Sequence, residues 1–235
     1  MPDAKKTDDL RERLLDAALV HVPFDGWSEA TLRAAAVDAG VEPGLVRALF
    51  PRGAPDLALA YHERGDLAML ARLRSEDLSA LRFRDRVAAA VRLRIEVIED
   101  REAVRRGATL FALPQHSADG ARALWRTADR IWTALGDTSD DLNWYSKRAI
   151  LSGVYGSAVL FWLGDDSVGH QATWEFIDRR IEDVMRFEKL KAGIGKNALL
   201  APLMAGPNWL ARQVRAPAQF PPADLPGIWR GQMQE

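Results

Sequence analysis

Residues 28–50 constrain the fold of this chain most strongly, because they read as two short helices joined by a tight turn. Ser28 can cap the first helix by accepting a hydrogen bond from its free amides, and Gly40 is the residue type that commonly follows a helix end. Pro43 suits the first turn of a second helix. The segment therefore predicts a helix-turn-helix, a device with which many proteins read DNA.

The side chains of this segment do not suit a DNA reader. The second helix begins at Glu42 and Pro43 and then carries mainly apolar residues, with Arg47 its one cation. Residues 1–62 hold seven Lys and Arg against ten Asp and Glu. Because DNA affinity depends on positive charge near the phosphates, the sequence argues against DNA as a partner.

The rest of the chain predicts helices only. Ala, Leu, Arg and Glu recur at three- and four-residue spacings, and alternating β-branched runs are missing. We expect nine or ten helices in an N-terminal helix-turn-helix-like subdomain (1–55) and a larger helical domain (56–192), followed by an amphipathic segment (193–215) and a proline-rich tail (216–235). Outside the helix-turn-helix, the expected helices span about residues 8–22, 56–73, 83–98, 102–113, 118–135, 143–163 and 171–190.

The residues that carry most enzyme chemistry are missing or scattered. The 235 residues include no cysteine, and the four histidines do not form a metal-binding pair on one helix. Neither a Gly-x-Ser-x-Gly elbow nor a phosphate-binding loop occurs. We therefore predict no enzyme, no metal and no cofactor. The charged N-terminal segment lacks the apolar core of a secretory signal, which predicts the cytoplasm.

The segment 143–163 predicts a buried central helix. Its last fifteen residues, from Ala149 onward, carry no charge. A membrane-spanning helix needs about 20 apolar residues, so this run is too short. Gly153, Gly156 and Ser157 would allow a neighbouring backbone to approach closely.

Aromatic side chains crowd the junction between the helices expected at 118–135 and 143–163. Two interpretations remain open. The aromatic residues close the core, or they form an exposed anchor for another protein, because Trp and Tyr are enriched at interface hot spots. The candidate partner contacts are Ile131, Asp141, Trp144 and Tyr145.

Residues 194–215 combine apolar side chains with cations, and no acid occurs between Glu188 and Asp224. This composition is typical of a segment that lies in an anionic membrane interface. Docking of a last helix onto the domain is the alternative. The candidate membrane contacts are Leu199, Leu200, Leu203, Met204, Trp209, Leu210 and Arg212.

These segments carry two family resemblances. The first 62 residues resemble the tetracycline-repressor family, in which three short helices precede an all-α domain that binds ligand and dimerises. A closer resemblance is to the ubiquinone-biosynthesis accessory proteins numbered nine in the coenzyme Q pathway. It rests on LLDAALVHVPFDGWSEATLRAAA (14–36), DDLNWYSKRAILSGVY (140–155) and TWEFIDRRIEDVM (173–185).

The closer resemblance implies an all-α, tetracycline-repressor-like fold that has lost DNA reading. It further implies a hydrophobic pocket for an isoprenoid lipid or ubiquinone precursor, and a C-terminal amphipathic helix that meets the membrane surface. The implied partner is the di-iron demethoxyubiquinone hydroxylase, which would dock on Asp141, Trp144 and Tyr145. The apolar faces of the central helices supply candidate lipid contacts, with plain core as the alternative: Val154, Ala158, Phe161, Trp162, Ile177 and Ile181.

The leading hypothesis is a non-enzymatic lipid-binding accessory protein of ubiquinone biosynthesis. It would act as a homodimer at the inner face of the membrane and present an isoprenoid quinone intermediate to the hydroxylase. The alternative is a ligand-responsive repressor of the tetracycline-repressor family that binds DNA as a dimer. A hydrolase or transferase is a third hypothesis, which would need a polar cluster that only a structure could assemble.

Overall fold

The computed structural model describes the backbone of residues 2–196, and the side chains of residues 6–184 and 186. Within this range the chain forms nine α-helices, one 3-10 turn and no strand, which confirms the predicted all-α class. The elements are α1 (Pro2–Asp25), α2 (Glu29–Asp38), α3 (Pro43–Leu49), α4 (Ala54–Ser75), α5 (Phe83–Glu96), α6 (Arg101–Ala112), α7 (Ser117–Ala134), α8 (Leu142–Leu163), η1 (Val168–His170) and α9 (Gln171–Lys196).

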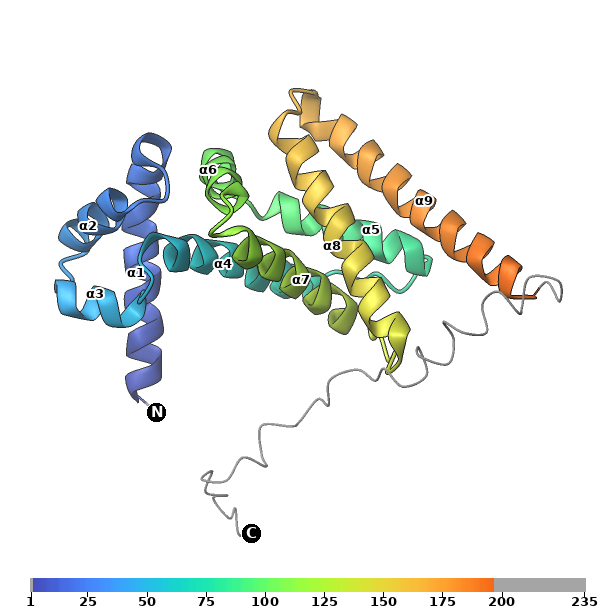
Figure 1. Ribbon diagram of the computed structural model, residues 1–235, viewed down its shortest axis with the longest axis horizontal. Coiled ribbons are helices and arrows are strands. Elements are labelled where there is room, and N and C mark those ends of the chain that lie inside the picture. Colours follow the sequence, from blue (N-terminus) through green and yellow to red (C-terminus); the bar gives the residue numbers. More distant parts are fainter. Residues whose placement is uncertain (1, 197–235) are drawn as a thin grey trace, which may run out of the picture.

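Two hydrophobic cores organise these helices. The first lies among α1, α2 and α3 and includes the buried side chains of Leu14 and Phe50. The second lies among α5, α7, α8 and α9 and includes Ile131 and Ile177. Figure 1 shows α1–α3 at one end of the molecule and α8 and α9 at the other, with α4 running between them. Helix α4 contributes Leu57 and Ala58 to the first core and Met69 to the second.

The helix-turn-helix forms as its capping residues predict. The Ser28 hydroxyl oxygen accepts a hydrogen bond from the Thr31 amide at 3.2 Å, at the start of α2. Gly40 follows α2 with a φ of +61°, a left-handed conformation that glycine adopts without steric cost. Pro43 is the first residue of α3. Local capping chemistry therefore sets the bounds of α2 and the start of α3.

The apolar pattern misplaces one face of α4. Leu67 follows Ala60 by seven residues and precedes Leu70 by three, a spacing that predicts an inward position. It is nevertheless 57% exposed, whereas the neighbouring Asp66 is fully buried. The reason is electrostatic, because Asp66 pairs with Arg94 and Arg130 inside the domain. Helix α1 also runs further than expected, through Pro23 to Asp25, and ends where Gly26 takes a φ of +66°.

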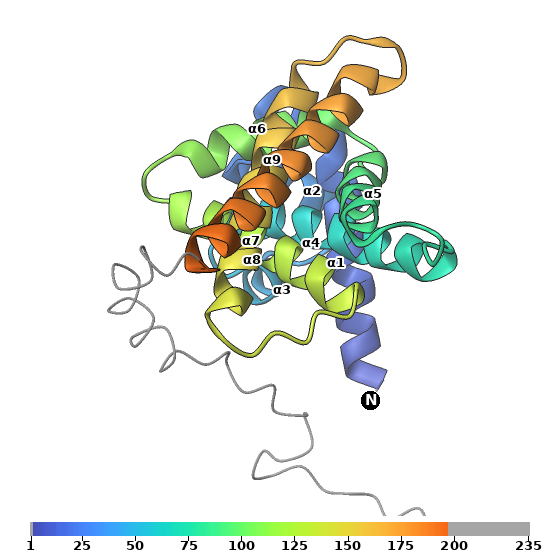
Figure 2. The same ribbon diagram turned by 90° about the vertical axis from the view of Figure 1, so that its right-hand side faces the viewer.

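Helix α8 is the central helix of the larger domain. It contacts α7 and α9, and Figure 2 shows α9 crossing in front of it. No helix among the described residues is both long and apolar enough to cross a membrane. Of the two glycines expected to permit close approach, Gly156 does so, since a Cβ there would lie 3.1 Å from the Leu124 side chain. A Cβ at Gly153 would meet no atom within 4 Å, so this glycine borders open space.

Candidate functional site

A cavity of about 630 Å³ lies between α4, α6, α7 and α8. Sites for small molecules are typically concave, mostly apolar and about 300–1,000 Å³ in volume, so this cavity has the size of a ligand site. Its walls are rich in glycine and alanine. The small residues that line it include Ala58, Gly65, Ala68, Ala103, Gly107, Ala108, Gly120, Ala121, Ala123, Gly153 and Gly156.

The small residues explain why the cavity is open. On α8, Gly153 and Gly156 are three residues apart and therefore share one face of the helix. On α6, Ala103 and Gly107 occupy the same face at a spacing of four. Glycine and alanine extend at most one carbon from the backbone. The facing surfaces of the four helices therefore leave the space between them unfilled. Leu160 of α8 lines the cavity and is 66% exposed, which places it at the mouth.

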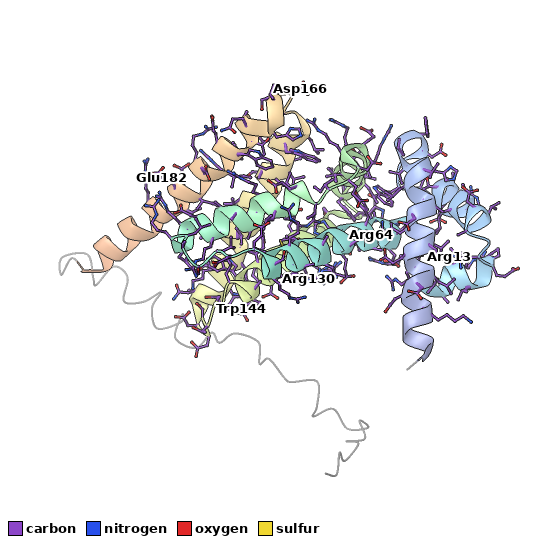
Figure 3. All side chains as sticks on the ribbon, turned by 180° about the vertical axis from the view of Figure 1, so that it is seen from behind. Arg13, Arg64, Arg130, Trp144, Asp166 and Glu182 are labelled. Atoms are coloured by element: carbon purple, nitrogen blue, oxygen red, sulfur yellow. The ribbon has the colours of Figure 1, made fainter. Side chains whose placement is uncertain are left out.

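One end of the cavity adjoins a buried polar cluster centred on Asp66. Arg94 Nε donates a hydrogen bond to Asp66 Oδ1 at 2.7 Å, and the Thr127 hydroxyl donates to the same oxygen at 2.8 Å. Arg130, labelled in Figure 3, reaches Asp66 from α7, with its Nη1 2.8 Å from Oδ2. Arg130 Nη2 also donates to Glu63 Oε1 at 2.7 Å. The two arginines and the two carboxylates therefore balance each other's charge.

The environment of this cluster fixes its protonation. Burial by itself would raise the pKa of Asp66, but the neighbouring His62 and Arg94 hold it below its ordinary value. Burial, assisted by the charge of Arg94, lowers the pKa of His62 to about 4, so its imidazole is neutral near pH 7. His62 Nε2 lies 2.8 Å from the Thr127 hydroxyl oxygen. Among the described residues, no group of three or more His, Asp or Glu is arranged to hold a metal ion.

Two tyrosines, Tyr61 and Tyr155, line the cavity. Tyr155 is buried, and its ring centre lies 5.6 Å from Cζ of Arg94. Burial raises the pKa of Tyr155 to about 12, which keeps its hydroxyl protonated. The Tyr61 hydroxyl donates to the Asp100 carbonyl at 3.2 Å. The Trp27 indole donates to the Ala103 carbonyl at 2.9 Å, which ties the N-terminal helices to the cavity wall.

The six residues predicted as lipid contacts lie on the other side of α8 from this cavity. None of them lines it. Five are buried in the second core, namely Val154, Ala158, Trp162, Ile177 and Ile181. Phe161 is 39% exposed and stacks on Phe176 with ring centres 4.5 Å apart. The cavity face of α8 instead carries Ser152, Gly153, Gly156 and Val159, which the apolar pattern did not single out.

The predicted partner contacts fall into two groups. Trp144 and Tyr145 are half-buried and, together with Trp125, form what we call the aromatic patch. The ring centre of Trp144 lies 4.8 Å from that of Tyr145 and 6.0 Å from that of Trp125. Asp141 is exposed and caps α8 by accepting the Asn143 amide at 2.8 Å. Ile131 is fully buried, so it belongs to the core and offers no surface to a partner.

The aromatic patch rests on a buried cation. Cζ of Arg148 lies 4.0 Å from the ring centre of Trp144. The guanidinium donates to Asp129 at 2.6 Å and to Asp137 at 3.1 Å, which fixes its position. Figure 3 shows Trp144 at the edge of the molecule, at the N-terminal end of α8. The aromatic patch therefore has partly exposed rings whose inner side packs on the fixed guanidinium of Arg148.

The seven predicted membrane contacts, Leu199, Leu200, Leu203, Met204, Trp209, Leu210 and Arg212, lie outside the described residues. Helix α9 ends at Lys196, directly before this segment in the sequence.

The depressed pKa of His62 predicts a pH-dependent stability. Between pH 6.5 and 4 the unfolded chain protonates this imidazole and the folded chain does not, so the free energy of unfolding falls as the pH falls. In His62→Gln this contribution is lost. Urea unfolding at pH 7, 6, 5 and 4 should show a steeper loss for the unmodified protein, by up to about 1.4 kcal/mol per pH unit. Parallel pH profiles for the two proteins would contradict the assignment.

The chain is similar to a named family and to a solved fold. The COQ9 family model matches residues 117–188. The probable ubiquinone biosynthesis protein coq9, mitochondrial, of Dictyostelium discoideum is 30% identical over 197 residues, which cover 79% of this chain and 63% of that protein. The human ubiquinone biosynthesis protein COQ9, mitochondrial, is 27% identical over 195 residues, covering 78% and 60%. The chain thus spans about three fifths of the length of these relatives.

The solved structure of a TetR transcriptional regulator from Nitrosomonas europaea matches the fold with a TM-score of 0.61. The match covers 74% of this chain and 97% of the regulator at 19% sequence identity, so it concerns the fold alone. Family matches and fold agree with the resemblances carried by residues 14–36, 140–155 and 173–185. The chain is therefore similar to the COQ9 proteins over about four fifths of its own length, and it has the all-α fold of a TetR-type regulator.

Proposed function

We propose that this protein is a non-enzymatic lipid-binding accessory protein of ubiquinone biosynthesis. In this proposal it holds an isoprenoid quinone intermediate and presents it to the demethoxyubiquinone hydroxylase. The observation that carries the proposal is the cavity of about 630 Å³, with its walls of small residues and a polar end where arginine charges are balanced by carboxylates. The pathway comes from the relatives, which are named as ubiquinone biosynthesis proteins.

The polar cluster supports binding rather than catalysis. The carboxylate of Asp66 already accepts hydrogen bonds from Arg94, Arg130 and Thr127, so it is not free to take a proton from a substrate. The neutral His62 imidazole is held against Thr127. A satisfied cluster of this kind holds the helices and orients a ligand, and it offers no activated nucleophile.

The repressor alternative receives no support from α3. This helix has seven residues, and Arg47 is its one cation. Glu42 stands at its start, where a reader of DNA would need to approach phosphates. We therefore keep DNA out of the proposal, while the homodimer expected from the resemblance remains part of it. Saturable, sequence-specific DNA binding in a gel shift at low salt would favour the repressor instead.

The aromatic patch and Asp141 are the proposed docking surface for the hydroxylase. Trp144 is anchored on Arg148 and keeps part of its ring exposed, which suits an interface hot spot. The basic segment 193–215 is the proposed membrane contact, which would place the protein peripherally at the inner face of the membrane. None of Trp125, Asp141, Trp144 and Tyr145 lines the cavity.

Gly153→Leu tests the cavity as the lipid site. A side chain at this position meets no atom within 4 Å and enters the space at the cavity mouth. The variant should bind decylubiquinone at least tenfold more weakly in calorimetry, while its stability is kept or slightly raised, because leucine favours a helix over glycine by up to about 1 kcal/mol. Ala149→Leu, at an exposed position of α8 outside the cavity, is the matched control. Equal weakening in both variants would remove the cavity from the proposal.

Trp144→Ala tests the docking surface. Truncating a hot-spot tryptophan should weaken binding of the hydroxylase by about 2 kcal/mol or more, close to a thirtyfold rise in Kd. Val168→Ala, at a fully exposed apolar residue of η1, should leave the Kd unchanged. Thermal unfolding of both variants completes the measurement. If Trp144→Ala unfolds the protein and leaves the affinity of the folded fraction intact, Trp144 is a core residue.

Deletion of residues 194–215 tests the membrane contact. The full chain should sediment with vesicles of phosphatidylglycerol, because cations and apolar side chains bind an anionic interface together. The deleted chain should stay in the supernatant with nearly the same helical circular dichroism per residue. Sedimentation of the deleted chain at the level of the full chain would refute the role of this segment.

A further inference from the structure

Two polar atoms of buried side chains at the cavity, Arg94 Nη1 and the Tyr155 hydroxyl oxygen, have no hydrogen-bond partner among the described residues. Arg94 is 3% exposed and Tyr155 is 2% exposed, and both line the cavity. Arg94 uses Nε on Asp66 and Nη2 on the His62 carbonyl, at 2.7 and 2.9 Å. Among the described residues, no hydrogen bond engages Arg94 Nη1 or the Tyr155 hydroxyl. Neither atom is among the fully buried polar atoms that lack a partner, so each keeps some accessible surface, and both residues line the cavity.

The two groups occupy the same end of the cavity. The Arg94 guanidinium lies against the backbone of Gly65, where a Cβ would come within 2.5 Å of Nη1. Gly65 itself lines the cavity, so Nη1 stands at its wall. The ring centre of Tyr155 is 5.6 Å from Arg94 Cζ. Since buried donors are normally hydrogen-bonded, two fixed donors facing an apolar space indicate a ligand atom that accepts from them.

The charge of this end favours a neutral acceptor over an anion. The charge of Arg94 is compensated by Asp66, and Arg130 by Glu63 and Asp66. Arg64 also lines the cavity, but it pairs with Glu12 and Asp16 at 2.6 and 2.8 Å. Glu99 adds a carboxylate to the lining. An anion would therefore find no net positive charge, whereas a neutral oxygen would find two donors.

We propose that this end of the cavity is a head-group subsite, in which Arg94 Nη1 and the Tyr155 hydroxyl donate hydrogen bonds to a carbonyl oxygen of a quinone ring. The prenyl tail then runs along the small residues of α6 and α8 to the mouth beside Gly153 and Leu160. This inference rests on the proposed function, because it assumes that the cavity holds an isoprenoid lipid. It adds the polarity of the ligand and its direction in the cavity.

Tyr155→Phe tests the subsite, because it removes a hydroxyl that makes no hydrogen bond with the described residues. The variant should fold with unchanged stability and bind decylubiquinone about tenfold more weakly, as loss of a hydrogen bond in a buried site predicts. Its affinity for dodecylbenzene, an apolar probe without oxygen, should be unchanged. Ala149→Leu, at an exposed position of α8 outside the cavity, is the control. This control should bind decylubiquinone within twofold of the unmodified protein.

The outcomes separate the subsite from the proposed function. If the unmodified protein binds both probes and Tyr155→Phe loses affinity for neither, the subsite is wrong and the lipid cavity stands. If the unmodified protein binds neither probe, the proposed function fails. If lysophosphatidic acid binds more tightly than decylubiquinone and loses affinity in Tyr155→Phe, the acceptor is an anion and the inference is overturned.

A spectroscopic measurement keeps the test decisive if Tyr155→Phe does not fold. The infrared carbonyl stretch of decylubiquinone bound to the unmodified protein should lie at lower wavenumber than in a hydrocarbon solvent, because hydrogen bonds weaken the carbonyl bond. A stretch at the hydrocarbon position would show that no donor reaches the carbonyl, and would overturn the inference.

Discussion

The buried carboxylate of Asp66 is the interaction on which the larger domain depends. It lies on α4 and receives hydrogen bonds from Arg94 of α5 and from Arg130 and Thr127 of α7. One side chain therefore joins three helices that border or support the cavity. Removing one partner of such a buried pair leaves an uncompensated charge, which typically costs about 3–5 kcal/mol. The same arrangement fixes Arg94 at the cavity wall.

The cavity arises from small residues on helices that are held apart elsewhere. Asp66 and its arginines set the spacing at one end, and Trp27 bonded to Ala103 ties the first three helices to α6. Between these points Gly107 and Gly153 leave space that larger side chains would fill. The fold of a TetR-type regulator thus serves here as a frame around a cavity, while its helix-turn-helix carries acids where a DNA reader needs cations.

Local chemistry in the sequence predicted the fold well. Ser28, Gly40 and Pro43 predicted the helix-turn-helix because caps and turns depend on residues close in the chain. The cavity was not predictable in the same way. Apolar periodicity identifies apolar faces, and α8 has two of them, one packed on the core at Val154 and one facing open volume at Gly153. Which face is filled depends on α4, α6 and α7, which lie far away in the sequence.

The Asp66 cluster was missed for a related reason. A lone acid beside Leu67 reads as a solvated residue, and its partners Arg94 and Arg130 are 28 and 64 residues away. The small-residue spacing on α8 was visible, but it was interpreted as close helix packing. Only Gly156 has that role, since Gly153 borders the cavity.

The central claim is that the cavity holds an isoprenoid quinone. Mass spectrometry of lipid extracted from the purified full-length chain tests it most directly, with the Gly153→Leu protein prepared in parallel. The account predicts an isoprenoid quinone or its precursor in near-stoichiometric amount from the unmodified protein and a strongly reduced amount from the variant. Phospholipid alone, or equal quinone from both proteins, would contradict it.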